Sequence, residues 1–330
     1  MLQLKNATPF AADIAIFPNE QGIDTLYTVV KATFTLGNAW TLAEEQLPPQ
    51  EGDEYWGEPE TSSIKYASDF HTGKPSTDIV VIGEACAPNQ KPVKRLEVQV
   101  SVGQLNKTLH VFGDRIWNEG QITEPEPFIT MPIVYERAFG GQHKLDEHQC
   151  LAEGRNLVGC SFLGKRSTEE MNGMPLPNIE EPLELIQEQG DQPKPAGFGF
   201  CSPGWLPRRQ YVGTCDEAWE NERAPYLPVD FDSRHLNAAH PDLIYPGYLI
   251  GGEAISIKNM HPDGEIRVAL PQIKMLCKIN LAGKFYAPEI NMESLIIEPN
   301  KKQLSMVWKA GFACDKKALK IDGIELKLAR

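Results

Sequence analysis

The sequence predicts a mainly β protein of antiparallel sheets, arranged as a sandwich or a barrel-like body, with a long ordered loop region and one or two short helices. Three observations support this. Alternating β-branched and aromatic residues concentrate in residues 1–117 and 253–330. Turn sequences separate the short strand patterns, as is typical of hairpins. The stretch between, residues 118–252, holds 14 of the 26 prolines, which excludes long helices and strands there.

The N-terminal region contains three clear strand signals. Residues 25–36, TLYTVVKATFTL, alternate and are rich in β-branched and aromatic side chains. Residues 78–84, DIVVIGE, form a short apolar run between turn residues. Residues 96–102 and 107–112 flank GQLN and predict a hairpin. The first strand of that hairpin, LEVQVSV, would send its leucine and its three valines to one face.

Four successive hairpin signals in the C-terminal region predict an antiparallel meander. Their loops are HPDG, LAG, EPNKK and Asp322-Gly323, the last being a favoured type I′ turn. The flanking strand patterns are 254–259 with 265–270, 273–280 with 284–286, 294–297 with 303–308, and 319–321 with 324–326. This region has few large aromatics, so we expect it to pack on the N-terminal sheets within a single domain, residues 1–330.

The middle region should be ordered, because large apolar side chains are spread along it and disordered linkers lack them. Two short helices are predicted within it. Thr214 and Glu217 have the spacing of a capping box ahead of Trp219. Residues 182–189 could form a second helix that Gly190 stops.

Composition restricts the class of protein. The chain has 330 residues, a net charge of −13, 41% hydrophobic and 23% charged residues, which is normal for a folded soluble chain. An acidic chain repels nucleic acid and anionic lipid, so neither is expected as a partner. The sequence contains no run of about 18 apolar residues, so no membrane helix is predicted. Residues 1–17 are typical of a strand rather than of a signal peptide.

The seven cysteines are scattered and form no C-x-x-C pair, which argues against a disulfide framework. Free thiols in a reducing cytoplasm are the simpler interpretation, so a cytoplasmic location is expected. His143, His148, Cys150 and Cys160 could form a metal site, but their spacing fits no common zinc pattern. We therefore expect no metal and no other cofactor.

The first candidate site is the segment YERAFGG. Glu136 and Arg137 would point to opposite faces of an extended chain, so they would not pair with each other. Gly140 and Gly141 permit a positive φ and a close backbone approach. Two interpretations remain, a binding loop that presents Arg137 and Phe139, or a packed turn with a buried ion pair. Arg137 is expected to be largely buried or paired with a carboxylate.

The second candidate is the segment DFDSR, which contains Asp230, Asp232 and Arg234. Two carboxylates at i and i+2 share one face of an extended segment. There they could hold a cation or serve as acid and base in glycoside hydrolysis. The alternative is structural, with one carboxylate capping a helical turn and the other pairing with Arg234.

Asp69 and His71 form a third candidate, because a catalytic triad needs such residue types. However, the sequence contains no G-x-S-x-G elbow, no H-E-x-x-H and no Walker A motif. The G-x-G element at residues 197–199 lacks the third glycine of a dinucleotide fingerprint. We therefore expect no enzyme. The alternative is a hydrolase, for example one acting on glycans, that uses Asp230 and Asp232 or Asp69 and His71.

Ten short motifs follow one another in a consistent order. They are residues 68–85, 113–117, 127–141, 155–162, 176–180, 195–200, 205–209, 213–219, 225–239 and 251–253. Together they resemble a bacterial domain of unknown function that is found beside type VI secretion effectors. The resemblance covers the chain from near residue 1 to about residue 275, and it brings no catalytic residue set.

The resemblance implies a function by binding. Members of that family are regarded as effector adaptors or chaperones that connect a toxin, or its PAAR-like tip domain, to the trimeric spike of the secretion machine. It therefore implies an effector toxin or PAAR-like domain as partner, and the spike protein as a further one. A structural component of the secreted particle is a third reading. The binding or structural candidates are Tyr135, Glu136, Arg137, Phe139, Gly140, Gly141, Trp205, Arg208, Trp219, Asp230, Phe231, Asp232 and Arg234.

Overall fold

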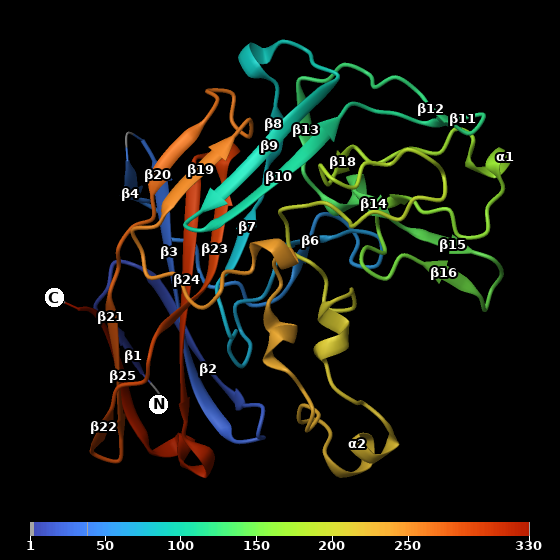
Figure 1. The fold of residues 1–330 in the computed structure, drawn as a ribbon. Coiled ribbons are helices and arrows are strands. Elements are labelled where there is room, and N and C mark those ends of the chain that lie inside the picture. Colours follow the sequence, from blue (N-terminus) through green and yellow to red (C-terminus); the bar gives the residue numbers. More distant parts are fainter. Residues whose placement is uncertain (1–2, 38, 330) are drawn as a thin grey trace.

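A six-stranded sheet joins the two ends of the chain (Figure 1). The computed structural model describes residues 3–37 and 39–329. The predicted strand at residues 25–36 is confirmed as β3, which pairs antiparallel with β24 along almost its whole length. Ten consecutive residues of β3 are buried, so both of its faces are covered. The strands, in spatial order, are β2 (Ala11–Pro18), β3 (Asp24–Leu36), β24 (Gln303–Ala313), β23 (Asn291–Glu298) and β7 (Asp78–Val81), with β4 (Trp40–Leu42) also paired to β3.

The second large sheet combines one hairpin from each end of the chain. The predicted hairpins β9–β10 and β19–β20 are both confirmed, and antiparallel pairing of β9 with β19 joins them. The predicted face of β9 is also confirmed, because Leu96, Val98, Val100 and Val102 are all buried. The strands, in spatial order, are β18 (Ile179–Glu180), β10 (Leu105–Phe112), β9 (Arg95–Val102), β19 (Ala254–Lys258) and β20 (Ile266–Ala269).

The third large sheet shows that the predicted C-terminal meander is wrong. The hairpins β19–β20, β21–β22 and β23–β24 exist, but each belongs to a different sheet. The predicted hairpin at Asp322-Gly323 does not form, because both residues lie inside one strand, β25. Pairing of Ile321 and Gly323 with β21, and of the residues that follow with β1, overrides the local turn preference. The strands, in spatial order, are β1 (Leu4–Asn6), β25 (Ile321–Leu328), β21 (Met275–Leu281) and β22 (Lys284–Tyr286).

The three sheets share one hydrophobic core. A single cluster of buried side chains includes Val98 of β9, Leu295 of β23 and Ile279 of β21. None of these sheets closes into a barrel within residues 3–37 and 39–329. Five two-stranded ribbons complete the β structure. They are β5 (Glu54–Tyr55) with β6 (Ile64–Tyr66), β8 (Glu84–Cys86) with β13 (Thr130–Pro132), β11 (Trp117–Asn118) with β12 (Gln121–Ile122), β14 (Phe139–Gly140) with β17 (Cys160–Ser161), and β15 (Gln142–Lys144) with β16 (Cys150–Ala152).

Residues 118–252 form an ordered region beside the sheets (Figure 1). The predicted helix near Trp219 is confirmed as α2 (Glu217–Glu222), but its cap is Asp216, whose carboxylate accepts the Trp219 N–H. The other α-helix, α1 (Thr168–Met171), was not predicted, although Ser167 and Glu170 form a complete capping box. No helix in the part of the chain that the structure describes is long and apolar enough to cross a membrane.

The helix predicted for residues 182–189 does not form. Carboxylates from outside this segment accept hydrogen bonds from several of its backbone N–H groups. The Ile186 N–H donates to the Glu180 carboxylate, and the N–H groups of Gln187 and Glu188 donate to the Asp191 carboxylate. The segment is therefore a series of turns.

Asp78, at the start of β7, ties this loop region to the sheets. Its carboxylate is completely buried and accepts hydrogen bonds from Lys74 Nζ at 2.7 Å, Asn237 Nδ2 at 2.9 Å and the Ala238 N–H at 2.7 Å. Lys74 Nζ also donates to Ser294 Oγ of β23 at 2.8 Å. One carboxylate thus connects the N-terminal region, the loop region and the C-terminal sheet strand.

Residues 254–330 expressed alone are expected to remain unfolded. Their hairpins complete three different sheets, and each of these sheets has further strands outside the fragment. Circular dichroism and NMR of the isolated fragment, with the full chain as control, would measure this. A cooperative urea transition of the fragment would contradict the shared core.

Candidate functional site

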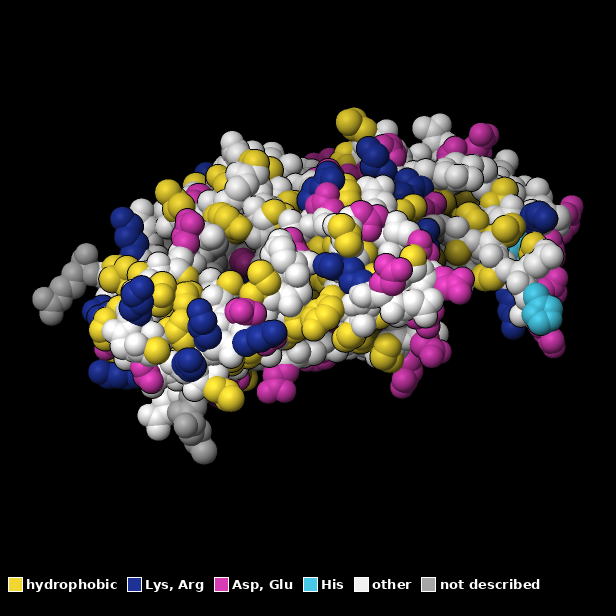
Figure 2. All heavy atoms as spheres, turned by 90° about the horizontal axis from the view of Figure 1, so that it is seen from below, with side chains coloured by type: hydrophobic (Ala, Val, Ile, Leu, Met, Phe, Trp, Pro, Cys, Tyr) yellow, Lys and Arg dark blue, Asp and Glu magenta, His cyan; other side chains and the backbone are white. Residues whose placement is uncertain are grey.

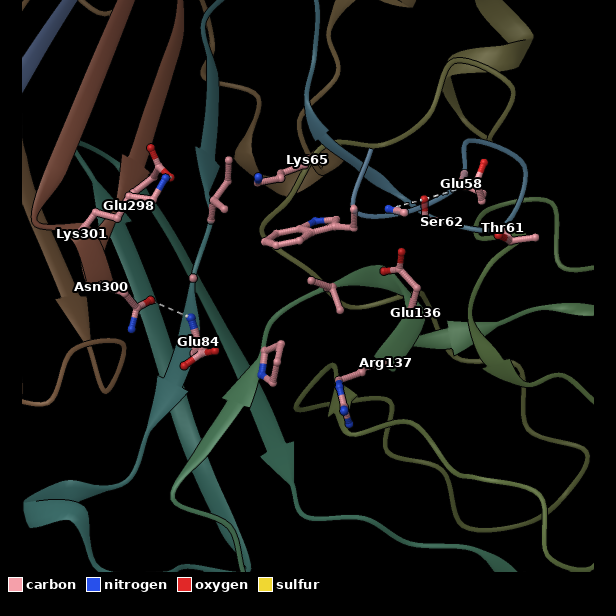
Figure 3. A pocket seen from close by; sticks show the side chains of 16 residues that line it. Glu58, Thr61, Ser62, Lys65, Glu84, Glu136, Arg137, Glu298, Asn300 and Lys301 are labelled. Carbon is pink, nitrogen blue, oxygen red and sulfur yellow. Dashed lines mark hydrogen bonds and ion pairs between the residues drawn. The ribbon is translucent and has the colours of Figure 1, made fainter. Parts of the chain in front are cut away.

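A groove of about 830 Å³ opens where three segments meet (Figure 3). One wall is the β5–β6 hairpin, the second is the 3-10 turn Tyr135–Arg137, and the third is the end of β23 with the turn that follows it. The chain leaving β7 passes along the groove between these walls. The main side chains of the three walls are, in turn, Trp56 and Lys65, Glu136 and Arg137, and Glu298 and Lys301.

Glu136 fixes the first two walls to each other. Its carboxylate accepts the Ser63 N–H at 2.6 Å and the Ser63 hydroxyl at 2.8 Å. Ser63 lies in the loop between β5 and β6, so one ionised side chain holds the hairpin against the turn that carries Arg137. Charge-assisted hydrogen bonds of this kind are stronger than neutral ones, so they hold the two walls together.

The third wall is a compact polar group around Glu298. Its carboxylate, buried at the end of β23, accepts the Tyr66 hydroxyl at 2.7 Å and pairs with Lys301 Nζ at 2.7 Å. Burial raises the pKa of Tyr66 above its ordinary value, so its hydroxyl remains a donor at neutral pH. The Lys301 side chain is more than half exposed, so it brings a positive charge to the groove.

The apolar part of the groove is centred on Trp56, which is 45% exposed. Lys65 Nζ lies 5.4 Å from the centre of the indole ring, a distance typical of a cation–π contact. Ile82, Pro132 and Val134 line the groove as well. The site therefore offers an accessible aromatic face, an apolar floor, and charges of both signs around it.

The glycines of YERAFGG make the predicted close approach. Gly140 has a φ of +153° and Gly141 a φ of +108°. A Cβ on Gly140 would collide with the carbonyl oxygen of Asn156. The buried Asn156 amide donates to the carbonyl oxygens of Tyr135 at 2.8 Å and Phe139 at 3.0 Å. The motifs at residues 127–141 and 155–162 thus pack against each other in one turn.

Phe139 does not face a partner, so the reading in which the loop presents it is wrong. It is 2% exposed and packs in a small cluster with Trp117, Met171 and Leu176. The flanking glycines turn the chain inward at this point. The packed-turn alternative therefore describes Phe139.

Comparison with known proteins adds a family. The family described as "Uncharacterized protein conserved in bacteria (DUF2169)" matches residues 21–309. The chain belongs to this family. No curated protein matches the chain. No solved structure matches it either. The matched residues include all three walls of the groove.

Arg137 is paired with a carboxylate, which is one of its two expected arrangements, and it is partly exposed instead of largely buried. Its side chain is 38% exposed, and it donates to Asn178 Oδ1 at 2.8 Å and pairs with the exposed Asp114 carboxylate at 3.4 Å. The buried guanidinium is that of Arg115, which pairs with Glu180. Sequence reasoning missed Arg115, although it lies in the motif GDRIW. Arg137 lines the groove with part of its side chain exposed, whereas Arg115 stabilises the fold.

Asp230 and Asp232 are each held by structural contacts of their own. Asp230 accepts the Thr214 N–H and hydroxyl, and these bonds hold the pKa of Asp230 below its ordinary value. Asp232 caps the 3-10 turn Ser233–Leu236 and also pairs with Arg234, which lowers the pKa of Asp232. The structural alternative therefore describes this segment, except that Asp232 performs both predicted tasks.

The remaining candidates of this region tie loops together. Trp205 is buried edge-on against the Tyr135 ring, with 5.4 Å between ring centres. Arg208 donates to the carbonyl oxygens of Cys201 and His235. The Trp219 indole N–H donates to the Tyr226 carbonyl oxygen at 2.8 Å. The ring of Phe231 packs edge-on against that of His235, with 5.8 Å between ring centres.

Asp69 and His71 belong to a buried ionic network. Asp69 pairs with Lys31 at 3.2 Å, and His71 Nδ1 lies 2.8 Å from Lys309 Nζ. Burial lowers the pKa of His71 well below its ordinary value, and the charge of Lys309 adds to this effect. Lys309 pairs with Glu293 at 3.0 Å, and burial lowers the pKa of Lys309 to about 8. A neutral His71 and a paired Asp69 hold the sheet strands together here.

A second cavity, of about 360 Å³, contains Tyr135, Cys201 and His240. Burial raises the pKa of Cys201 to about 11 and lowers the pKa of His240 to about 3. A nucleophilic cysteine needs the reverse arrangement, a thiolate beside an imidazolium. This pair is therefore adapted to packing, with the Tyr135 hydroxyl 3.2 Å from Cys201 Sγ.

The side chains that lie close enough together to bind a metal ion differ from those considered from sequence. Among the described residues, they are Glu181, His240 and Asp242. Lys107 Nζ bonds both carboxylates, at 2.5 Å to Glu181 and 2.9 Å to Asp242, and so supplies the positive charge that they need. All seven cysteines are free thiols, as expected. Within the described part of the chain, His143, His148, Cys150 and Cys160 do not come together as a possible set of metal ligands.

Arg115→Ala and Arg137→Ala should differ strongly in their effect on stability. Removing Arg115 leaves the buried Glu180 carboxylate without its cation, so we expect a loss of about 3–5 kcal/mol in the free energy of unfolding. Arg137 forms an exposed pair, so we expect a loss of about 0–1 kcal/mol. Urea unfolding measures both. An Arg137 variant as unstable as the Arg115 variant would show that the exposed pair is structural.

Proposed function

We propose that this protein is an adaptor or chaperone for type VI secretion effectors. It binds a toxin effector, or its PAAR-like domain, in the groove between Trp56 and Arg137 and helps to load that client onto the secretion spike without catalysis. Loading takes place in the cytoplasm, before the spike is fired. The proposal is supported by the ordered motifs of the sequence and by the chemistry of the groove.

The single observation that carries the proposal is the exposed aromatic face inside a charge-lined groove. Binding energy at protein interfaces concentrates in a few aromatic and arginine side chains that sit in a pocket with a polar rim. Trp56 and Arg137 are residues of these types, and Glu136 holds the segments that carry them together. The cavity is of the size that a few side chains of a client segment would fill.

The ionisable side chains of the groove also favour binding over catalysis. A catalytic acid or base needs a free position beside the reacting atom. Here Glu136 is held by Ser63, and Glu298 is held by Tyr66 and Lys301. These carboxylates shape the walls, and the side chains that expose surface in the groove include Trp56, Arg137 and Lys301.

Trp56→Ala should weaken the binding of the client by roughly 30-fold, the effect of losing an aromatic hot spot of about 2 kcal/mol. Tagged protein from the bacterium that encodes it would first be purified with its partners, and mass spectrometry would identify them. Calorimetry with the purified partner would then measure the dissociation constant.

Leu183→Ala is the matched control, because Leu183 is a fully exposed apolar side chain outside the groove. It should leave the affinity unchanged. Recovery of partners without any secretion effector, PAAR-like protein or spike protein would contradict the proposed function. An affinity equal for the Trp56 variant and the wild type would contradict the proposed site.

A further inference from the structure

The four-stranded sheet carries a second surface, which is basic, whereas the chain as a whole is acidic. We call it the basic face. It lies at the end of the molecule where β22 and the 3-10 turn Asp315–Lys320 meet, and Figure 2 shows Lys and hydrophobic side chains gathered there. Its members are the exposed Lys5, Lys274, Lys278, Lys316, Lys317, Lys320 and Lys327, together with Leu276, Phe285 and Leu319.

The charge of this face is unusual for the protein. Residues 3–6, 273–286 and 314–329 contain eight lysines and three acidic residues, a net charge of +5, in a chain whose total is −13. A local field of this sign attracts acidic groups, while the remainder of the surface repels them. The charge is therefore directed at one place on the molecule.

Strand pairing brings the lysines and the apolar side chains together. Leu276 lies opposite Lys327 in the β21–β25 pair, and Lys278 lies opposite Glu325, whose carboxylate pairs with Lys5 at 3.3 Å. Lys278 Nζ lies 3.9 Å from the centre of the Phe285 ring, which is 62% exposed.

The turn that carries Leu319 is fixed to the same hairpin. The Ala282 N–H donates to the Lys320 carbonyl oxygen at 3.0 Å, and the Gly283 N–H donates to the Asp322 carboxylate at 3.1 Å. The lysines and apolar tips of the hairpin and of the turn thus form one surface.

The edge of this sheet is open. β22 pairs only with β21 among the described residues, and all three of its residues are exposed. A segment that binds here can contact lysines, apolar side chains and an unpaired strand edge at once. β1, β25 and the 3-10 turn Asp315–Lys320 lie outside the family match at residues 21–309, so this surface is built partly from chain beyond the shared family region.

We propose that the basic face binds an acidic segment of a second partner protein, one that carries apolar side chains between its carboxylates. This inference rests on the proposed adaptor function, to which it adds a separate binding surface. Charge complementarity selects the acidic groups, and the exposed Phe285 and Leu319 select apolar side chains beside them. A phosphate backbone offers no such apolar surface, and an anionic membrane is repelled by the rest of the acidic chain.

The test uses the full chain and a charge-reversal variant, Lys278→Glu, Lys320→Glu and Lys327→Glu. The matched control is Lys91→Glu, Lys94→Glu and Lys144→Glu, which changes the net charge equally at exposed lysines elsewhere. The probe is a synthetic peptide of alternating Glu or Asp with Leu or Phe. Its counterpart has Gln and Asn in place of the acidic residues. Thermal melting confirms that both variants are folded.

The wild type and the control variant should bind the acidic peptide with the same dissociation constant, which should rise with salt. The face variant and the neutral peptide should bind at least ten times more weakly. Trp56→Ala should leave this binding unchanged, so failure of the groove and failure of this face are distinguishable.

Several results would overturn the inference. Equal binding by both charge variants would show that the lysines serve only to keep the sheet edge from pairing. Tighter binding to single-stranded DNA, or to vesicles of phosphatidylserine and phosphatidylcholine, would assign the face to a different partner. Concentration-dependent dimerisation that only the face variant abolishes would make a second copy the occupant.

Discussion

The buried carboxylate of Asp78 is the point on which the arrangement of the molecule depends. It accepts hydrogen bonds from Lys74 and from two groups of the loop region, Asn237 and Ala238. Removing one partner of a buried charge leaves the other uncompensated, so these contacts form or fail together. From Asp78 the chain runs along β7 and directly into Ile82 and the other residues that line the groove. The same ion pair therefore fixes the loop region and positions the binding site.

The sequence predicted the local parts of the fold well. The hairpins β9–β10 and β19–β20 form because alternating side chains and a short turn suffice to specify them. The pairings of β3 with β24 and of β1 with β25 join opposite ends of the chain, and no local pattern encodes them. Asp322-Gly323 shows the limit of turn chemistry, since pairing of Ile321 and Gly323 with β21 keeps this dipeptide within a strand.

The candidate site was found only in part. Glu136 and Arg137 do line the groove. Gly140 and Gly141, which follow them, have positive φ values and let the chain turn there. Which arginine is buried could not be read from neighbouring apolar residues, since Arg115 and Arg137 both lie among them. Trp56 was missed because its hairpin is short and irregular. The hairpin reaches the groove through the contact between Ser63 and Glu136, which no local sequence pattern encodes.

The central claim is that the groove between Trp56 and Arg137 receives the client, and hydrogen–deuterium exchange tests it most directly. The exchange of backbone amides would be compared for the free protein and for its complex with the purified client. Binding in the groove predicts slower exchange in residues 56–65, 132–137 and 298–301, with little change around α1 and the β15–β16 ribbon. Protection confined to segments away from the groove, with these three segments unchanged, would contradict the account.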